Sequence, residues 1–157
     1  MIRMDYPTPD FKTRTHSSGR PEIFDQIRRR WVRLSPEEWV RQNVIHWMTT
    51  VGGYPQGMMA VEKEIRLGQL RKKFDILLYD PFHQPWLMVE CKAMDVPLTE
   101  GVLMQVLSYN LAIPVTHLVI INGNECHIVS RNPSGVTWLD HWPEYPGSAK
   151  VITDSAI

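Results

Sequence analysis

The sequence contains little cysteine and no long apolar run. Its 157 residues include two cysteines, Cys91 and Cys126, which are too few for a disulfide framework and are not spaced like metal ligands. No apolar stretch approaches the roughly 20 residues that a membrane-spanning helix needs, and no signal-peptide pattern opens the sequence. These absences favour a cytoplasmic protein that is not associated with a membrane.

Other absences limit the possible functions. The sequence has no glycine-rich ATP-binding loop, so we expect no motor translocase to be encoded in it. The six histidines show no ligand spacing, and each is interpreted as a surface or polar core residue. Internal repeats are missing. A hydrophobic content of 43% with 22% charged residues is typical of a soluble globular protein, and the length fits one domain.

Charge is balanced overall but unevenly distributed. Residues 1–73 hold 14 Lys and Arg against 8 Asp and Glu, whereas residues 74–157 hold 3 against 9. Such asymmetry favours a side of the protein that faces phosphate. The run Arg28–Arg30 by itself is interpreted as solvated surface. The run Arg71, Lys72 and Lys73 adjoins a candidate site and is interpreted as a nucleic-acid contact.

One helix is clearly indicated near the middle of the first half. It spans Ser35–Thr50, with Ser35 as its N-cap, Pro36 at its first position and Glu38 completing a capping box. The pair Gly52-Gly53 ends it. An apolar stripe at helical spacing is predicted to face the core, formed by Trp39, Val40, Val44, Trp47 and Met48.

The later elements predict an α/β fold. Apolar runs and turn residues indicate, in order, a strand, a hairpin, a helix, a strand and a second hairpin, at Met58–Leu67, Phe74–Tyr79 with Trp86–Val89, Thr99–Ile113, His117–Ile121 and Glu125–Ser130. The strands on either side of the second helix should be parallel, with a right-handed crossover. We expect a mixed central sheet of about 4–6 strands flanked by helices.

The chain divides into three segments on this interpretation. Residues 1–22 carry prolines and a glycine among polar residues and are predicted to form an N-terminal arm. Residues 23–131 form the main domain, and residues 132–157 form a C-terminal edge segment and tail. Ile23–Arg33 is compatible with either a short helix or a strand-like lead-in.

The first predicted hairpin carries charge where a core strand should not. If Asp80 and Pro85 pair across the turn, antiparallel pairing places Asp75 opposite Glu90. Because side chains alternate along a strand, Glu90 shares a face with the lysine two residues later. Buried charges are costly unless they are paired or bound to metal. Two interpretations follow: an ion pair at the rim of the sheet, or a site that binds a cation.

A family resemblance is carried by Asp75, then Glu90-Cys91-Lys92, then Gln105-x-x-x-Tyr109. This set resembles the PD-(D/E)XK nuclease superfamily. Within the superfamily, the sequence is similar to the N-terminal nuclease domain of type I restriction enzyme R subunits and to small stand-alone relatives. The similarity covers roughly Ile23 to Cys126 in the expected order. Its supporting segments are Leu34–Gln42, Lys73–Ile76, Val89–Ala93, Gln105–Asn110 and Asn122-Gly123.

The resemblance implies a restriction-endonuclease-like fold and a metal-dependent nuclease that hydrolyses DNA. Asp75, Glu90 and the backbone carbonyl of Cys91 would hold Mg²⁺, for which Mn²⁺ can substitute. Lys92 would hold the attacking water and offset charge that grows on the phosphate, or act as the base. Cys91 points to the core on parity, so we expect no cysteine nucleophile.

The resemblance also assigns residues on the two helices. Gln105 and Tyr109, four residues apart on one helix face, would hold the substrate strand beside the metal. Glu38 would either approach the metal or serve only as a helix cap. DNA is the expected partner, with a homodimer or partner subunits supplying specificity or translocation. The alternatives are a DNA-binding module of the same fold that cleaves nothing, and a structural or partner-binding domain.

Overall fold

The computed structural model describes residues 1–147, which form two β-sheets and two α-helices. The larger sheet has seven strands in the order β1-β9-β8-β7-β6-β5, with β10 beside β9. Its strands are β1 (Ile2–Arg3), β5 (Met59–Leu67), β6 (Leu70–Tyr79), β7 (Pro85–Cys91), β8 (His117–Ile121), β9 (Glu125–Asn132) and β10 (Gly135–Leu139). The predicted mixed sheet is confirmed, with one strand more than the 4–6 expected because the unpredicted β1 also pairs with β9.

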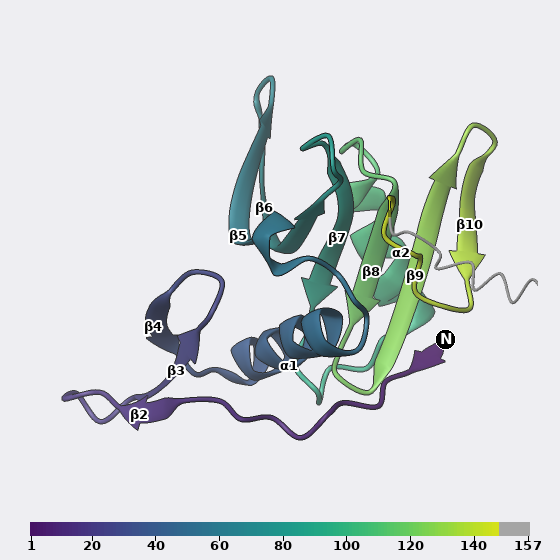
Figure 1. Cartoon of the computed structure of the whole chain (residues 1–157). Coiled ribbons are helices and arrows are strands. Elements are labelled where there is room, and N and C mark those ends of the chain that lie inside the picture. The colour runs from purple at the N-terminus through teal and green to yellow at the C-terminus, as the bar shows by residue number, and fades with distance from the viewer. Residues whose placement is uncertain (148–157) are drawn as a thin grey trace, which may run out of the picture.

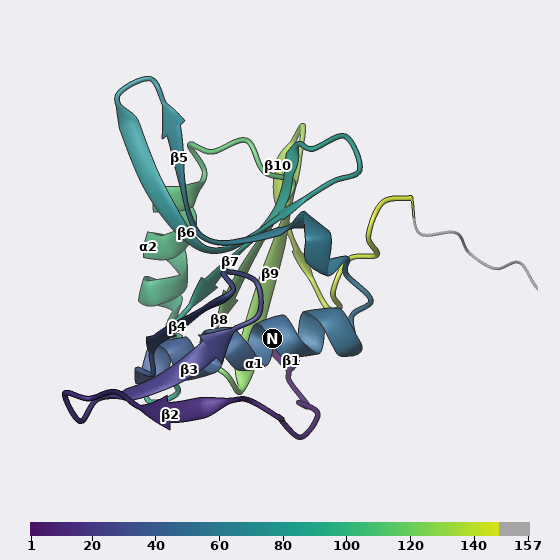
Figure 2. The ribbon, with the colours of Figure 1, turned by 60° about the vertical axis from the view of Figure 1, so that its left-hand side comes forward.

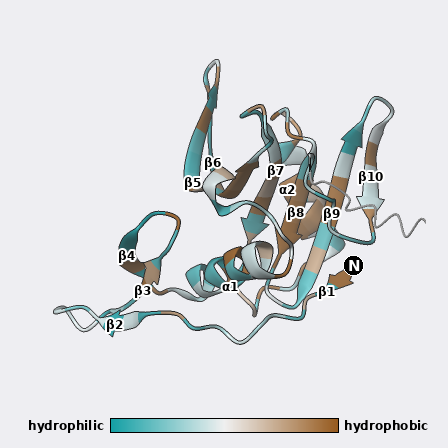
Figure 3. Ribbon diagram, in the orientation of Figure 1, coloured by the Kyte–Doolittle hydropathy of each residue, from teal (hydrophilic) through white to brown (hydrophobic). Residues whose placement is uncertain are grey.

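The two α-helices cover opposite faces of this sheet (Figures 1 and 2). Helix α1 (Pro36–Thr50) packs on one face and α2 (Glu100–Asn110) on the other. Two separate groups of buried apolar residues result, because a central strand turns alternate side chains to the two helices. Much of β8 is hydrophobic along its length (Figure 3), as expected for a strand that is buried on both faces.

Helix α1 begins and ends at the predicted residues. Ser35 Oγ accepts a hydrogen bond from the N–H of Glu38 at 3.1 Å, and Pro36 opens the helix. Past the other end, Gly53 has a φ of 71°, which a residue with a side chain adopts only at a cost. Val40, Val44 and Met48 are buried, as the apolar stripe predicts. The prediction is wrong for Trp39, which is 37% exposed and stacks edge-on against Phe11 instead.

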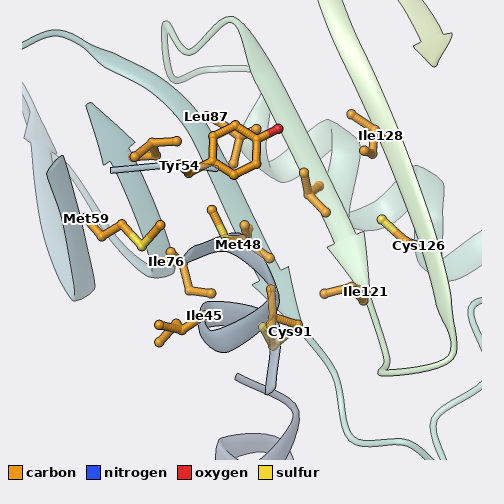
Figure 4. Packing of buried hydrophobic residues seen from close by; sticks show 14 of the residues in the cluster. Ile45, Met48, Tyr54, Met59, Ile76, Leu87, Cys91, Ile121, Cys126 and Ile128 are labelled. Carbon is orange, nitrogen blue, oxygen red and sulfur yellow. The ribbon is translucent and has the colours of Figure 1, made fainter. Parts of the chain in front are cut away.

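The core on the α1 side is a continuous layer between helix and sheet. Met48 and Ile45 of α1 project toward Ile76 of β6 and Cys91 of β7 (Figure 4). Cys91 is buried in this layer, 1% exposed, in agreement with the parity argument. Because Cys91 is fixed in the core, the residues on either side of it are fixed at the sheet surface.

Strands β6 and β7 pair in the predicted register, but the turn between them differs from the prediction. Ile76 pairs with Val89 and Leu78 with Leu87, which by continuation sets Asp75 against Glu90. The expected pairing of Asp80 with Pro85 is wrong, because Tyr79 opposes Pro85. A bulge between Leu78 and Tyr79 absorbs the one-residue difference, so the strand bodies keep their predicted alignment.

The segment after β7 forms the expected crossover. Thr99 Oγ1 accepts a hydrogen bond from the N–H of Val102 at 3.3 Å and caps α2, which ends at Asn110 rather than at the predicted Ile113. Strand β8 returns parallel to β7, as predicted, and β9 pairs antiparallel with β8. The C-terminal edge strand is also confirmed as β10, while residues 148–157 of the predicted tail lie outside the described residues.

The residues before α1 form a small separate sheet. Its order is β2-β3-β4, with β2 (Thr13–Thr15), β3 (Pro21–Asp25) and β4 (Arg30–Arg33). The open choice for Ile23–Arg33 is thus decided in favour of strands. This sheet lies beside the N-terminal end of α1, and the chain that leads to it from β1 runs along the same helix (Figures 1 and 2). Within residues 1–147, no helix is both long and apolar enough to cross a bilayer.

Candidate functional site

Asp75 is held at the centre of the candidate site by two donors. Its Oδ1 accepts a hydrogen bond from Arg41 Nη2 at 2.7 Å, and its Oδ2 accepts one from the backbone N–H of Cys91 at 2.8 Å. The second bond links β6 to β7 beyond the last pair of their ladder. Both oxygens of Asp75 therefore have partners from the protein itself.

Glu90 lies against Asp75 in a different environment. Its Oε1 is buried and has no hydrogen-bond partner among the described residues. Burial, and then the nearby charge of Asp75, raise the pKa of Glu90 to about 7, whereas the charges of Lys72 and Lys92 oppose this rise. An unsatisfied buried carboxylate oxygen favours a cation at this position.

Lys92 follows β7 directly and is half-buried. Its backbone N–H donates to the carbonyl of Ile121 at 2.8 Å, which extends the parallel pairing of β7 and β8 by one residue. Within residues 1–147 its ammonium forms no ion pair, although its charge opposes the rise in the pKa values of Glu90 and Glu37. The simple ion pair at the sheet rim, one of the two interpretations of the sequence, is not formed here.

The first helix contributes two residues that the sequence reasoning missed. Arg41 is 6% exposed and connects Asp75 to Glu38, whose Oε2 lies 2.9 Å from Arg41 Nη1. Glu37 lies one turn earlier on the same helix face, and its pKa is raised by burial and by the charge of Asp75. The charges of Arg41 and Lys92 oppose this rise. The spacing of four residues between Glu37 and Arg41 is the signal that would have revealed them.

Glu38 is drawn into an ionic network rather than toward the carboxylate pair. Its two oxygens contact Arg28 and Arg41, so its side chain is 6% exposed and satisfied. Arg28 also contacts Asp25 Oδ2 at 2.6 Å, and Gln42 Nε2 donates to the same oxygen at 3.0 Å. Ser35 caps the N–H of Glu38 as predicted, but the Glu38 carboxylate does not complete the capping box, because it contacts the two arginines and joins α1 to the small sheet.

Glu62 joins the same network at a distorted position of β5. It has a φ of 54°, and its carboxylate lies 3.3 Å from Lys73, 3.4 Å from Arg41 and 3.6 Å from Arg28. The pair with Lys73 is a cross-strand pair, and the contacts from α1 and the small sheet are additional.

Lys72 has a very different environment from its two basic neighbours. It is 4% exposed, and its Nζ lies 3.3 Å from the centre of the Tyr109 ring of α2. Burial lowers the pKa of Lys72 to about 8, and the charge of Glu90 opposes this. Arg71 and Lys73 are exposed, as expected of surface contacts with phosphate, but Lys72 instead fills the space between α2 and the carboxylates.

Gln105 and Tyr109, the predicted pair on α2, lie partly outside the group formed by Asp75, Glu90 and Lys72. Tyr109 is 61% exposed, with one face of its ring against Lys72, and Gln105 is exposed one turn earlier. The structure therefore gathers Asp75 and Glu90 with Lys72, and connects Tyr109 to them through that lysine. Among the described residues, no group of three or more His, Cys, Asp or Glu side chains is arranged to hold a metal.

A comparison of the sequence with protein families identifies the chain's relatives. Residues 36–143, about two thirds of the chain, match the profile of the family described as Type I restriction enzyme R protein N terminus. The chain belongs to this family. The match covers α1, the large sheet from β5 onward and all the site residues predicted from the sequence, but leaves out the small sheet. No curated protein matches the chain significantly.

Proposed function

We propose that this chain is a metal-dependent nuclease of the PD-(D/E)XK type that hydrolyses phosphodiester bonds in DNA as part of restriction. The observation that supports it most is the convergence of Asp75, midway along β6, with Glu90, near the end of β7. Membership of the type I restriction enzyme R family agrees with it. The order of elements, α1-β5-β6-β7-α2-β8, places both acids on the central hairpin between the two helices.

The donor set fits a magnesium ion. Mg²⁺ binds through one or two carboxylates and keeps several waters, and Glu90 Oε1 is a buried oxygen that lacks a partner. Asp75 and Glu90 would be the ligands, with the backbone carbonyl of Cys91 as a third, and Mn²⁺ may take the same place. When bound, the metal would supply an activated water and neutralise a phosphate oxygen.

The surrounding residues would act on the substrate. Lys92 places a positive charge beside the carboxylates, where it would orient a water and offset charge on the phosphate, or accept a proton. Gln105 and Tyr109 would position the scissile strand along α2. Arg71 and Lys73, both exposed on β6, would contact phosphates further along it.

One observation favours a second candidate function. Both oxygens of Asp75 are already engaged, by Arg41 and by the Cys91 N–H. A chain in which Arg41 permanently replaced the metal cation would bind DNA without cutting it. This alternative keeps the fold and the partner and differs only in the chemistry.

Cleavage of DNA with Mg²⁺ or Mn²⁺ separates the two functions. The nuclease proposal predicts cutting by the wild-type chain that is lost in Glu90→Gln and in Lys92→Ala. Glu64→Gln is the matched control, because Glu64 is an exposed acid of the neighbouring strand β5. Equal cutting by Glu90→Gln and the wild type would show that the activity does not come from this site. DNA binding without cutting would favour the second function.

The family also bears on partners and location. Because the family is named for the R protein of type I restriction enzymes, we expect partner subunits or a homodimer to supply sequence specificity or translocation. Such work on DNA would take place in the cytoplasm.

A further inference from the structure

A groove of about 840 Å³ separates the small sheet from the large one. Its floor is the N-terminal part of α1, and one wall is the β3–β4 hairpin, which stands beside that end of the helix (Figure 2). Arg28, Arg30, Trp31 and Arg33 line the hairpin wall, and Glu37, Arg41, Glu62 and Asp95 lie among the residues opposite. The groove thus reaches the helix face that carries Arg41, the partner of Asp75.

The two sides of the groove differ in charge. Arg28 and Arg41 are neutralised by carboxylates of the ionic network. Arg30 and Arg33, in contrast, are exposed and form no ion pair with any residue of the 1–147 range. Free positive charge is therefore confined to the hairpin wall, while the acidic side chains Glu37 and Asp95 stand on the other side.

The hairpin wall is firmly attached to the helix. Asp25 of β3 is fully buried and accepts a hydrogen bond from Gln42 of α1 at 3.0 Å. Arg28, in the turn of the hairpin, contacts Glu38 of α1, and Ile23 is buried completely. A preorganised wall binds a ligand with little loss of conformational entropy, which a free arm would have to lose on binding.

Trp31 indicates which part of a nucleic acid the wall would contact. The guanidinium of Arg14 covers its ring at 4.3 Å from the centroid, and Phe24 packs edge-on at 5.5 Å. With these neighbours the ring is held in place as support for the strand rather than left open for a base to stack on. The free groups of the wall are guanidinium groups, which bind phosphate oxygens.

We propose that the β3–β4 hairpin is a DNA phosphate-binding wall, in which Arg30 and Arg33 hold the backbone of the DNA that leads into the candidate site. This inference rests on the proposed function for the identity of the ligand. It concerns residues outside the matched range 36–143, so it is a feature of this chain and not of the family profile. It predicts binding that is insensitive to DNA sequence and weakened by salt.

The test compares two double variants of the full chain. Arg30→Ala/Arg33→Ala removes two charges from the wall. Arg3→Ala/Arg131→Ala removes two exposed arginines away from the wall, one on β1 beside the start of β9 and the other near the end of β9 beside β10. The affinity for a labelled duplex is measured by fluorescence anisotropy with a chelator present, between roughly 50 and 200 mM salt. Thermal melting confirms that each variant is folded.

The wall variant should lose two phosphate contacts. The magnitude of the slope of log K against log salt concentration should decrease by about 1.8. If the two contacts contribute nothing at 1 M salt, the affinity at 0.1 M salt should decrease by about 60-fold. The control should keep the wild-type slope. Arg33→Glu alone should weaken binding further than Arg33→Ala, because it adds repulsion. Cleavage by the wild type and by Glu90→Gln is assayed in parallel.

Four outcomes decide the inference. A weaker salt dependence of binding in the wall variant alone supports the phosphate-binding wall. This holds even if no metal produces cleavage, in which case only the nuclease proposal fails. An equal loss in both double variants would show an effect of net charge and overturn it. An unchanged wall variant would also overturn it, and Glu90-dependent cleavage would then leave the proposed function intact. A wild-type chain that binds no DNA would overturn both.

Discussion

Glu90→Gln removes the charge of the carboxyl whose pKa is raised to about 7 while keeping the size and shape of its side chain. Below pH 4.5, Glu90 is protonated in both the folded and the unfolded chain, so the substitution should change the free energy of unfolding little. Between pH 4.5 and 7 the unfolded carboxyl ionises while the folded one keeps its proton. The wild type therefore loses stability as pH rises through this range, and the glutamine variant does not.

The size of this effect follows from the two pKa values. A rise from 4.5 to about 7 corresponds to roughly 3 kcal/mol, at about 1.4 kcal/mol per pH unit. At pH 8 without metal, Glu90→Gln should thus be more stable than the wild type by up to about 3 kcal/mol. For a chain of this size that is a Tm higher by roughly 6–12 °C.

Thermal melts at pH 4, pH 6 and pH 8, with a chelator and then with Mg²⁺, provide the measurement. Added Mg²⁺ should raise the Tm of the wild type at pH 8 more than at pH 6, because binding requires the ionised carboxylate. The variant should respond weakly or not at all. Glu64→Gln, at an exposed position on β5, should behave as the wild type. Equal stability of Glu90→Gln and wild type at pH 8 in the chelator would refute the reasoning.

Three further predictions concern the network, the second helix and the end of the first. Arg41→Ala should lower the free energy of unfolding by about 3–5 kcal/mol, since it removes the guanidinium that pairs with Asp75 and leaves Glu38 with Arg28. The exposed Arg66→Ala should change it little, and similar urea midpoints for the two variants would disprove this. Gln105→Ala should leave the Tm unchanged but reduce DNA cleavage, and full activity would remove Gln105 from the proposed site. Gly53→Ala should lower the free energy of unfolding, measured by urea denaturation, by about 1 kcal/mol, because the φ of Gly53 is 71°. A Cβ there would meet no neighbour, so the cost is purely conformational, and an unchanged midpoint would contradict it.

The periodic and turn signals were sufficient for most of the large sheet. Ser35 and Thr99 cap their helices as predicted, and β7, α2 and β8 form the predicted crossover. These features depend on neighbours a few residues away in the chain, so local patterns contain the necessary information. Trp39 shows the limit of such patterns, because the helical stripe could not show that Phe11, from the N-terminal arm, would take that ring away from the core.

The candidate site was predictable only in part for the same reason. Strand parity and register brought Asp75 to Glu90, although the turn pairing used to derive the register was displaced by a bulge. The contacts of Arg41 with Asp75 and of Lys72 with Tyr109 join residues more than 30 positions apart in sequence. No local pattern specifies such contacts, so Lys72 was expected at the surface and is buried.

By itself, the sequence determined where α1 begins and ends, the order of helices and strands from β5 to β9, and which acids meet on the central hairpin. These follow from side-chain period, capping and turn chemistry, which act over a few residues. Tertiary packing alone decided that a buried arginine from the first helix holds one of those acids and that the residues before that helix form one wall of a groove. Both depend on the burial of charge between distant segments, because a charge removed from water is stable only where the fold supplies its partner.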